Sequence, residues 1–248
     1  MKKFFNSQMV LALILIALSV TFYFIHYLIF RDLHHIFFYL ITDIAFLFLN
    51  VLIVMLVFER LLAFRDKQSI LKKLNMVVGA FFSEAGTELL KRFSGLDTDP
   101  ADIRRKLIVT KDWSDRDFIK AHKAVRGYEG AINSEKADLD GLKIFLLAKR
   151  QFLLALLENP NLLEHESFTD LLWAVFHLTD ELAQRKDTAK LPGSDYQHLS
   201  GDIKRAYKHL ILQWLDYMRH LKIDYPYLFS LAMRTNPFDG NASVEVKG

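Results

Sequence analysis

The sequence predicts an all-α protein, in which a two-helix transmembrane hairpin is followed by a helical stalk and a cytoplasmic helical bundle. Three observations lead to this fold class. The first 58 residues contain two long apolar runs and only five charged side chains. The later residues carry nearly all the charge and repeat their apolar side chains at helical spacing. The prolines fall where the expected helices begin or end, and no alternating β-type segment of useful length is present.

Two apolar runs, residues 9–30 and 36–58, define the hairpin domain, which we place at 1–58. A bilayer core of about 30 Å needs roughly 20 apolar residues in a helix, and both runs satisfy this. The first run is longer than the apolar region of a signal peptide and has no clear small-x-small cleavage site. We therefore expect two uncleaved spans.

The link between the spans, residues 31–35, is so short that the two helices must run antiparallel. Basic residues lie at the open end of this hairpin: Lys2 and Lys3 on one side, and Arg60, Arg65, Lys67, Lys72 and Lys73 on the other. The positive-inside rule then predicts a multi-pass protein of the inner (plasma) membrane with both termini in the cytoplasm. The five juxtamembrane basic residues are expected to meet anionic lipid headgroups.

Four polar residues interrupt the apolar runs: Ser19 and His26 in the first, and Asp43 and Asn50 in the second. In an antiparallel hairpin, His26 falls at the depth of Asp43, and Ser19 at the depth of Asn50. Polar groups inside a bilayer face protein or water rather than lipid. We expect these pairs to hold the hairpin, or neighbouring hairpins, in register. The alternative is an ion path, which would require several copies because two helices cannot enclose a pore.

Beyond the hairpin we predict a basic helical stalk (59–94), a bundle of about five or six helices (95–240) and a flexible tail (241–248). Helix boundaries are marked by Asp99-Pro100, Asn159-Pro160 and Pro192-Gly193. Ser114 followed by Asp117 is typical of a capping box at the start of a helix.

Familiar chemical motifs are missing from this chain. It has no cysteine, which excludes disulfides and zinc–thiolate sites, and no phosphate-binding glycine loop, HExxH or GxSxG motif. The net charge of +3 is small, and the part after residue 58 is nearly neutral, so we expect no nucleic-acid partner. We also predict no cofactor.

The histidines do not predict a metal site. His198, His209 and His220 recur every eleven residues and share a helical stripe, but they lie about 16 Å apart along the axis. His177 is followed by acidic residues within one turn, as in phosphoacceptor helices, yet it lacks the accompanying proline and a nucleotide-binding domain. We interpret it as a polar residue on a bundle helix.

Aromatic residues gather near the C-terminus, at Tyr225, Tyr227, Phe229 and Phe238. They either dock this segment into the core or form an exposed patch that binds a partner.

Together these features favour a non-enzymatic, membrane-anchored protein-interaction module in a scaffold, adaptor or signalling role. Its partners would be the lipid bilayer, other proteins and, as an option, further copies of itself. The alternative function is an oligomeric membrane effector or ion channel, with Ser19, His26, Asp43 and Asn50 lining a pore. A helical enzyme on unrecognised residues is a third class.

Overall fold

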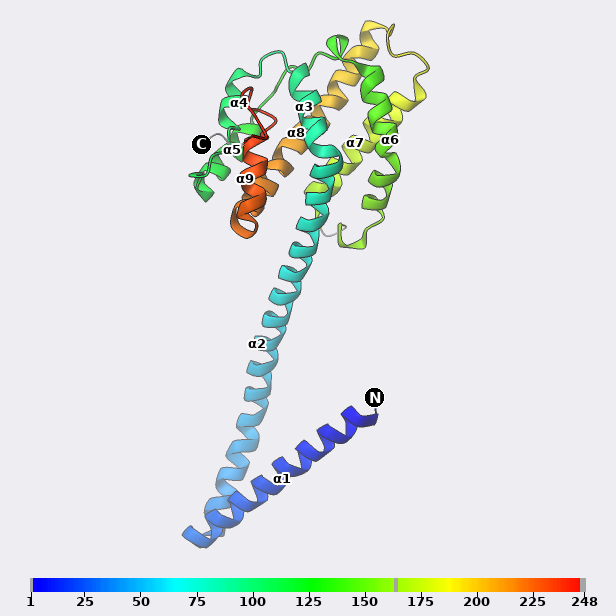
Figure 1. Ribbon diagram of the computed structural model, residues 1–248. Coiled ribbons are helices and arrows are strands. Elements are labelled where there is room, and N and C mark those ends of the chain that lie inside the picture. The colour runs from blue at the N-terminus through cyan, green and yellow to red at the C-terminus, as the bar shows by residue number, and fades with distance from the viewer. Residues whose placement is uncertain (1, 163–164, 246–248) are drawn as a thin grey trace. The chain divides into compact units, whose positions relative to one another are not determined.

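The computed structural model describes residues 2–162 and 165–245 (Figure 1). The chain divides into two compact units, residues 1–67 and 68–248. Within these described ranges the regular elements are helices. The single β-type feature is an isolated antiparallel bridge between Asp97 and Ile132. The all-α prediction is therefore confirmed.

The first unit contains α1 (Lys2–Phe30) and the N-terminal part of α2 (Leu33–Phe81). Arg31 adopts a left-handed conformation with φ 48° between the helices, and Asp32 Oδ1 accepts a hydrogen bond from the backbone N–H of His34 (2.9 Å) at the start of α2. Two segments, Met9–Phe30 and Ile36–Arg65, are long and apolar enough to cross a membrane, and no residue of their most apolar windows is buried within the protein.

The second unit begins on the C-terminal part of α2, which remains helical to Phe81, as the stalk prediction required. One π-helical turn, Phe82–Gly86, joins it to α3 (Thr87–Leu96). The helices that follow are α4 (Ala101–Lys106), α5 (Asp115–Arg126), α6 (Leu139–Leu157), α7 (Glu166–Gln184), α8 (Gly193–Asp224) and α9 (Pro226–Arg234). Short 3₁₀ turns occur at Ser134–Lys136 and Pro160–Leu162.

Helix α8 is the centre of the second unit, because it packs against α3, α5, α7 and α9. Its apolar residues recur every three or four positions and are almost completely buried: Leu199, Ile203, Ala206, Leu210, Trp214 and Leu221. Helix α7 covers another side of this face and also packs on α6.

The capping box predicted at the start of α5 is confirmed. The Asp117 carboxylate accepts hydrogen bonds from the backbone N–H of Ser114 (2.8 Å) and from its hydroxyl (2.7 Å). Residues 246–248 of the predicted tail lie outside the described residues.

The predicted boundary between a stalk and a bundle at residues 94 and 95 is wrong. Eight apolar side chains from this supposed stalk belong to the bundle core: Leu74, Val78, Phe81, Phe82, Ala85, Leu89, Leu90 and Phe93. A polar contact also joins this segment to α8, since the Asn75 amide lies 3.1 Å from His220 Nδ1. Helical periodicity located the helix correctly, but it could not show that its apolar face packs against α8.

The structure separates the two interpretations of the C-terminal aromatic residues, core docking and an exposed patch. Phe229 and Phe238 are buried in the core, and the Phe238 ring packs edge-on against Trp214 at 5.1 Å between centroids. Tyr225 is partly buried against the same core, whereas Tyr227 is 72% exposed. Two of the four side chains therefore dock the C-terminal segment instead of forming a surface.

These contacts predict which N-terminal truncations leave a folded bundle. A fragment beginning at Gln68 should be soluble, helical and cooperative in thermal unfolding, whereas one beginning at Gly95 should aggregate or lack a cooperative transition. The shorter fragment loses eight buried apolar side chains, and a large one contributes about 1.5–3 kcal/mol. Summed over these side chains, the loss is comparable to or larger than the roughly 5–15 kcal/mol by which domains are stable. Circular dichroism and gel filtration provide the measurement, and equal behaviour of the two fragments would contradict the assignment.

Two helical glycines, one at the end of the π-helical turn and one on α8, should respond in opposite ways to substitution by alanine. A Cβ at Gly86 would lie 2.7 Å from ring carbons of Phe81 and Phe82, whereas a Cβ at Gly201 in α8 would meet nothing within 4 Å. We expect Gly86→Ala to destabilise the protein by about 1–3 kcal/mol through overpacking, and Gly201→Ala to stabilise it by about 0.5–1 kcal/mol. Thermal unfolding of the full chain in detergent measures both, and an unchanged or raised Tm for Gly86→Ala would count against the close packing at this turn.

Candidate functional site

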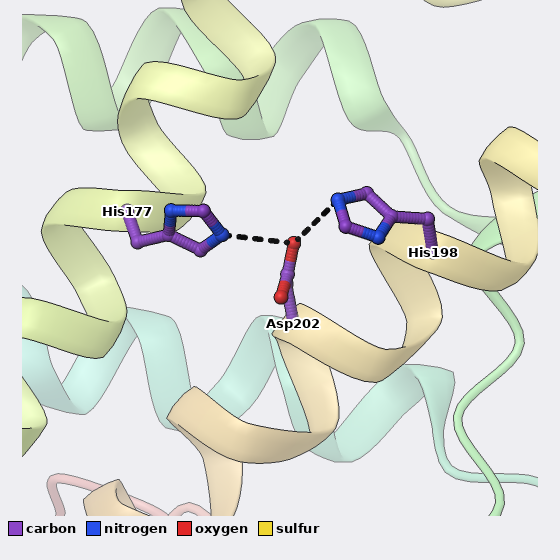
Figure 2. A group of neighbouring side chains, drawn as sticks. All are labelled: His177, His198 and Asp202. Carbon is purple, nitrogen blue, oxygen red and sulfur yellow. Dashed lines mark ion pairs between the residues drawn. The ribbon is translucent and has the colours of Figure 1, made fainter.

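A cluster of histidines and carboxylates lies where α7 meets α8. His177 and Glu181 are one turn apart on α7, and His198 and Asp202 are one turn apart on α8. Residues at i and i+4 share a face of a helix, so each helix presents one imidazole and one carboxylate to the other. Figure 2 shows His177 and His198 pointing toward Asp202 from opposite sides.

The packing of the two helices sets the position of these side chains. The residues that directly follow the cluster residues in the sequence are buried in the core: Leu178 and Leu182 on α7, and Leu199 and Ile203 on α8. The imidazoles lie at the rim, with side-chain exposures of 47% for His177 and 52% for His198, whereas that of Asp202 is 4%. The cluster therefore has a buried carboxylate at its base and two accessible histidines above it.

The distances within the cluster are longer than those of ordinary hydrogen bonds. Asp202 Oδ2 lies 3.3 Å from His198 Nε2 and 3.5 Å from His177 Nε2. Glu181 approaches the same two nitrogens at 3.6 Å and 3.9 Å. Asp202 Oδ2 is buried and makes no hydrogen bond, which is costly for a carboxylate oxygen.

Two arginines hold the outer oxygens of the carboxylates. Arg205 Nη1 donates to Asp202 Oδ1 (3.1 Å), and Arg185 Nη1 donates to Glu181 Oε2 (2.7 Å). Arg185 also forms a bidentate pair with Asp195, at 2.8 Å and 2.7 Å. The hydrogen bond from Arg185 lowers the pKa of Glu181, with smaller contributions from the nearby histidines. Glu181 is therefore ionised at neutral pH. Because Arg205 holds Oδ1 of Asp202, its other oxygen, Oδ2, is the one that faces the imidazoles.

Three of the four polar hairpin residues line one pocket between α1 and α2. Ser19, His26 and Asp43 share it with aromatic side chains, whereas Asn50 is not among its lining residues. Within the described residues no hydrogen bond or ion pair joins His26 to Asp43, and His26 Nδ1 is buried without a partner. The His26 ring packs on Phe30, with 4.7 Å between centroids.

The predicted membrane-surface residues Arg60, Arg65 and Lys73 are exposed on α2. The side chains of Lys67 and Lys72 lie outside the described residues.

Of the cluster residues, His177 and His198 stand out in the sequence, but nothing local in the chain shows that α7 and α8 lie side by side. The distance along α8 separates His198 from His209 and His220, but it does not bear on histidines of a neighbouring helix. A usable signal was present in the form of an i,i+4 His–acid pair on each of two consecutive helices. The group capable of holding a metal ion among the described residues is His177, His198 and Asp202, whose ligand atoms lie within 4.8 Å of one another.

The fold and these sites define a class of all-helical protein with two unburied apolar helices at the N-terminus and a helical bundle after them. The chain belongs to the MJ1433 family. Residues 2–62 match the family described as "MJ1433, N-terminal helical domain", and residues 70–234 match "Uncharacterized protein MJ1433, C-terminal helical domain".

A relative from Methanocaldococcus jannaschii, described as "Uncharacterized protein MJ1433", is 48% identical over 237 residues. The match covers 96% of this chain and 95% of that protein. No solved structure matches the chain. The gap between the two family matches contains the division between the structural units at residues 67 and 68.

Proposed function

We propose that this protein is anchored in the cell membrane by a hairpin of α1 and α2, and that its bundle binds another protein in a scaffold, adaptor or signalling role. The observation that carries the anchor is the exposure of Met9–Phe30 and Ile36–Arg65, whose most apolar windows have no residue buried within the protein. Large side chains such as Phe48 are 72% exposed there. Leaving so much apolar surface in water is unfavourable by about 25 cal/mol per Å², and a bilayer removes that cost.

The orientation follows from the basic residues at the open end of the hairpin. Lys2 and Lys3 precede the first span, and Arg60 and Arg65 occur at the end of the second. The turn contributes Arg31 next to Asp32, so it carries no net positive charge. Positive-inside bias therefore supports a cytoplasmic location for both termini and for the bundle.

The binding role is supported by an exposed apolar side of α9. Tyr227, Leu228 and Leu231 lie close together around this helix and are 72%, 40% and 43% exposed. Exposed apolar groups of this kind commonly mark contact surfaces. Of the four aromatic residues considered as a possible partner patch, this surface contains Tyr227.

The absence of cysteine from this chain allows a direct test of topology. His34→Cys, in the turn, should react with a membrane-impermeant maleimide on intact cells. Val244→Cys, which is 68% exposed in the native protein, should react only after the cells are permeabilised. The two variants are controls for one another, because each should give signal in a different condition. Labelling of Val244→Cys on intact cells would refute the proposed orientation.

A second test addresses binding through α9. After crosslinking in membranes, proteins captured by the wild type should be lost by about tenfold or more in Tyr227→Ser/Leu231→Ser, as expected for the removal of central contacts. Ile119→Ser provides the matched control, because Ile119 is 65% exposed on α5, away from α9 in sequence. If the α9 variant captures the same proteins as the wild type, this surface is not the binding site. If the variant instead differs from the wild type in how it is extracted from membranes, the surface contacts lipid.

A further inference from the structure

We propose that His177, Glu181, His198 and Asp202 bind one divalent metal ion of the zinc type at the surface rim between α7 and α8. This site is independent of the proposed anchor and of the α9 surface. It rests on the donor atoms of His177, His198 and Asp202, on their spacing, and on a buried Asp202 oxygen that has no hydrogen-bonding partner. Glu181 lies next to this group and would supply the fourth ligand.

The donor set fits this class of ion. Imidazole nitrogen and carboxylate oxygen are ligands that Zn²⁺ accepts, commonly in a four-coordinate arrangement. Two imidazoles also favour Zn²⁺ over hard cations such as Mg²⁺, which prefer oxygen ligands alone. Two carboxylates would balance the charge of the ion.

The spacing corresponds to the edges of a coordination tetrahedron. For metal–ligand bonds of about 2.0–2.1 Å, neighbouring ligand atoms are separated by about 3.3–3.4 Å. Asp202 Oδ2 lies 3.3 Å and 3.5 Å from the two imidazole nitrogens, so these two edges match. Glu181 Oε1, the oxygen that does not accept from Arg185, lies 3.9 Å from His177 Nε2, so this edge has to shorten when an ion binds. Both histidines are about half-exposed, so small rotations can close the longer edges.

The same chain shows what a direct histidine–aspartate contact looks like. His122 Nε2 lies 2.8 Å from Asp216, and His220 Nδ1 lies 2.7 Å from Asp224 at i+4 on α8. His198 and Asp202 have the same i,i+4 spacing on the same helix, yet their atoms stay 3.3 Å apart. The two contacts of Asp202 with His177 and His198 are therefore spaced for an ion between them rather than for direct hydrogen bonds.

The arginines act on the carboxylates from outside. Arg205 engages Asp202 Oδ1 and Arg185 engages Glu181 Oε2, as outer groups do when they orient metal-ligating carboxylates. Their positive charges oppose a bound cation, but Asp195 offsets that of Arg185 through the bidentate pair. These groups leave Asp202 Oδ2 and Glu181 Oε1 available to the ion.

The test uses the full chain in detergent, purified without a polyhistidine tag and freed of metal with a chelator. Equilibrium dialysis with Zn²⁺ should give one ion per chain. Co²⁺ should give the intense visible absorption of four-coordinate cobalt, and Zn²⁺ should raise the Tm. His177→Gln and His198→Gln alter half-exposed side chains and should fold, but they should weaken Zn²⁺ binding by at least about tenfold.

His220→Gln is the matched control, because it removes a histidine with an aspartate at i+4 from the same helix. It should bind Zn²⁺ as the wild type does. Asp202→Asn keeps the shape of the buried side chain and should abolish the cobalt absorption. The proposal is overturned if the wild type takes up no stoichiometric Zn²⁺ or Co²⁺, or if His198→Gln binds as tightly as His220→Gln.

Discussion

The burial of one face of α8 is the constraint on which the second unit depends. Four helices, α3, α5, α7 and α9, pack against it. An α-helix buries a continuous stripe only if its apolar residues recur every three or four positions, and α8 maintains this pattern from Leu199 to Leu221. Each neighbouring helix needs only one apolar face of its own, which explains how the rest of the bundle can be so highly charged.

Two polar residues within the buried surface of α8 differ in how they are satisfied. Gln213 is 2% exposed and its amide donates to Ser167 Oγ at 2.7 Å, so it links α8 to the start of α7. Asp202 is 4% exposed, and one of its oxygens has no hydrogen bond. Buried polar groups are normally paired. Tyr207 Oη of α8 is also buried without a hydrogen bond. Asp202 differs from Tyr207 because two histidines, His177 and His198, lie close to its unpaired oxygen.

The positions of the helices could be predicted from the sequence, but the contacts between them could not. Ser114 with Asp117 predicted the start of α5, and the apolar runs predicted the two long N-terminal helices, because these signals are local in the chain. The membership of Phe81 and Phe93 in the bundle core depends on contacts with distant residues such as Tyr207, whose ring lies 6.3 Å from that of Phe93. Periodicity within one helix carries no information about such partners.

The candidate site follows the same rule. The sequence shows His177 and His198 on separate helices, and nothing local in it shows that α7 packs against α8. The sequence also left open whether the aromatic residues near the C-terminus are buried or exposed, for a related reason. Phe229 and Phe238 have the same composition signal as an exposed patch, and only the docking of α9 decides that they are buried.

Helix α2 contains two segments that differ in how their apolar residues are distributed around the helix. From Ile36 to Arg65 it is apolar nearly all round, which is the requirement for a helix whose whole circumference faces lipid. From Leu74 onward one side of the helix is buried, at Leu74, Val78 and Phe81. The other side, with Lys73, Met76 and Ala80, is exposed. The change occurs between these segments, across Asp66, Lys67, Lys72 and Lys73. Hydrophobicity suits the first segment to a bilayer and the second to a protein core, so in the proposed anchor the charged segment between them would mark the membrane boundary.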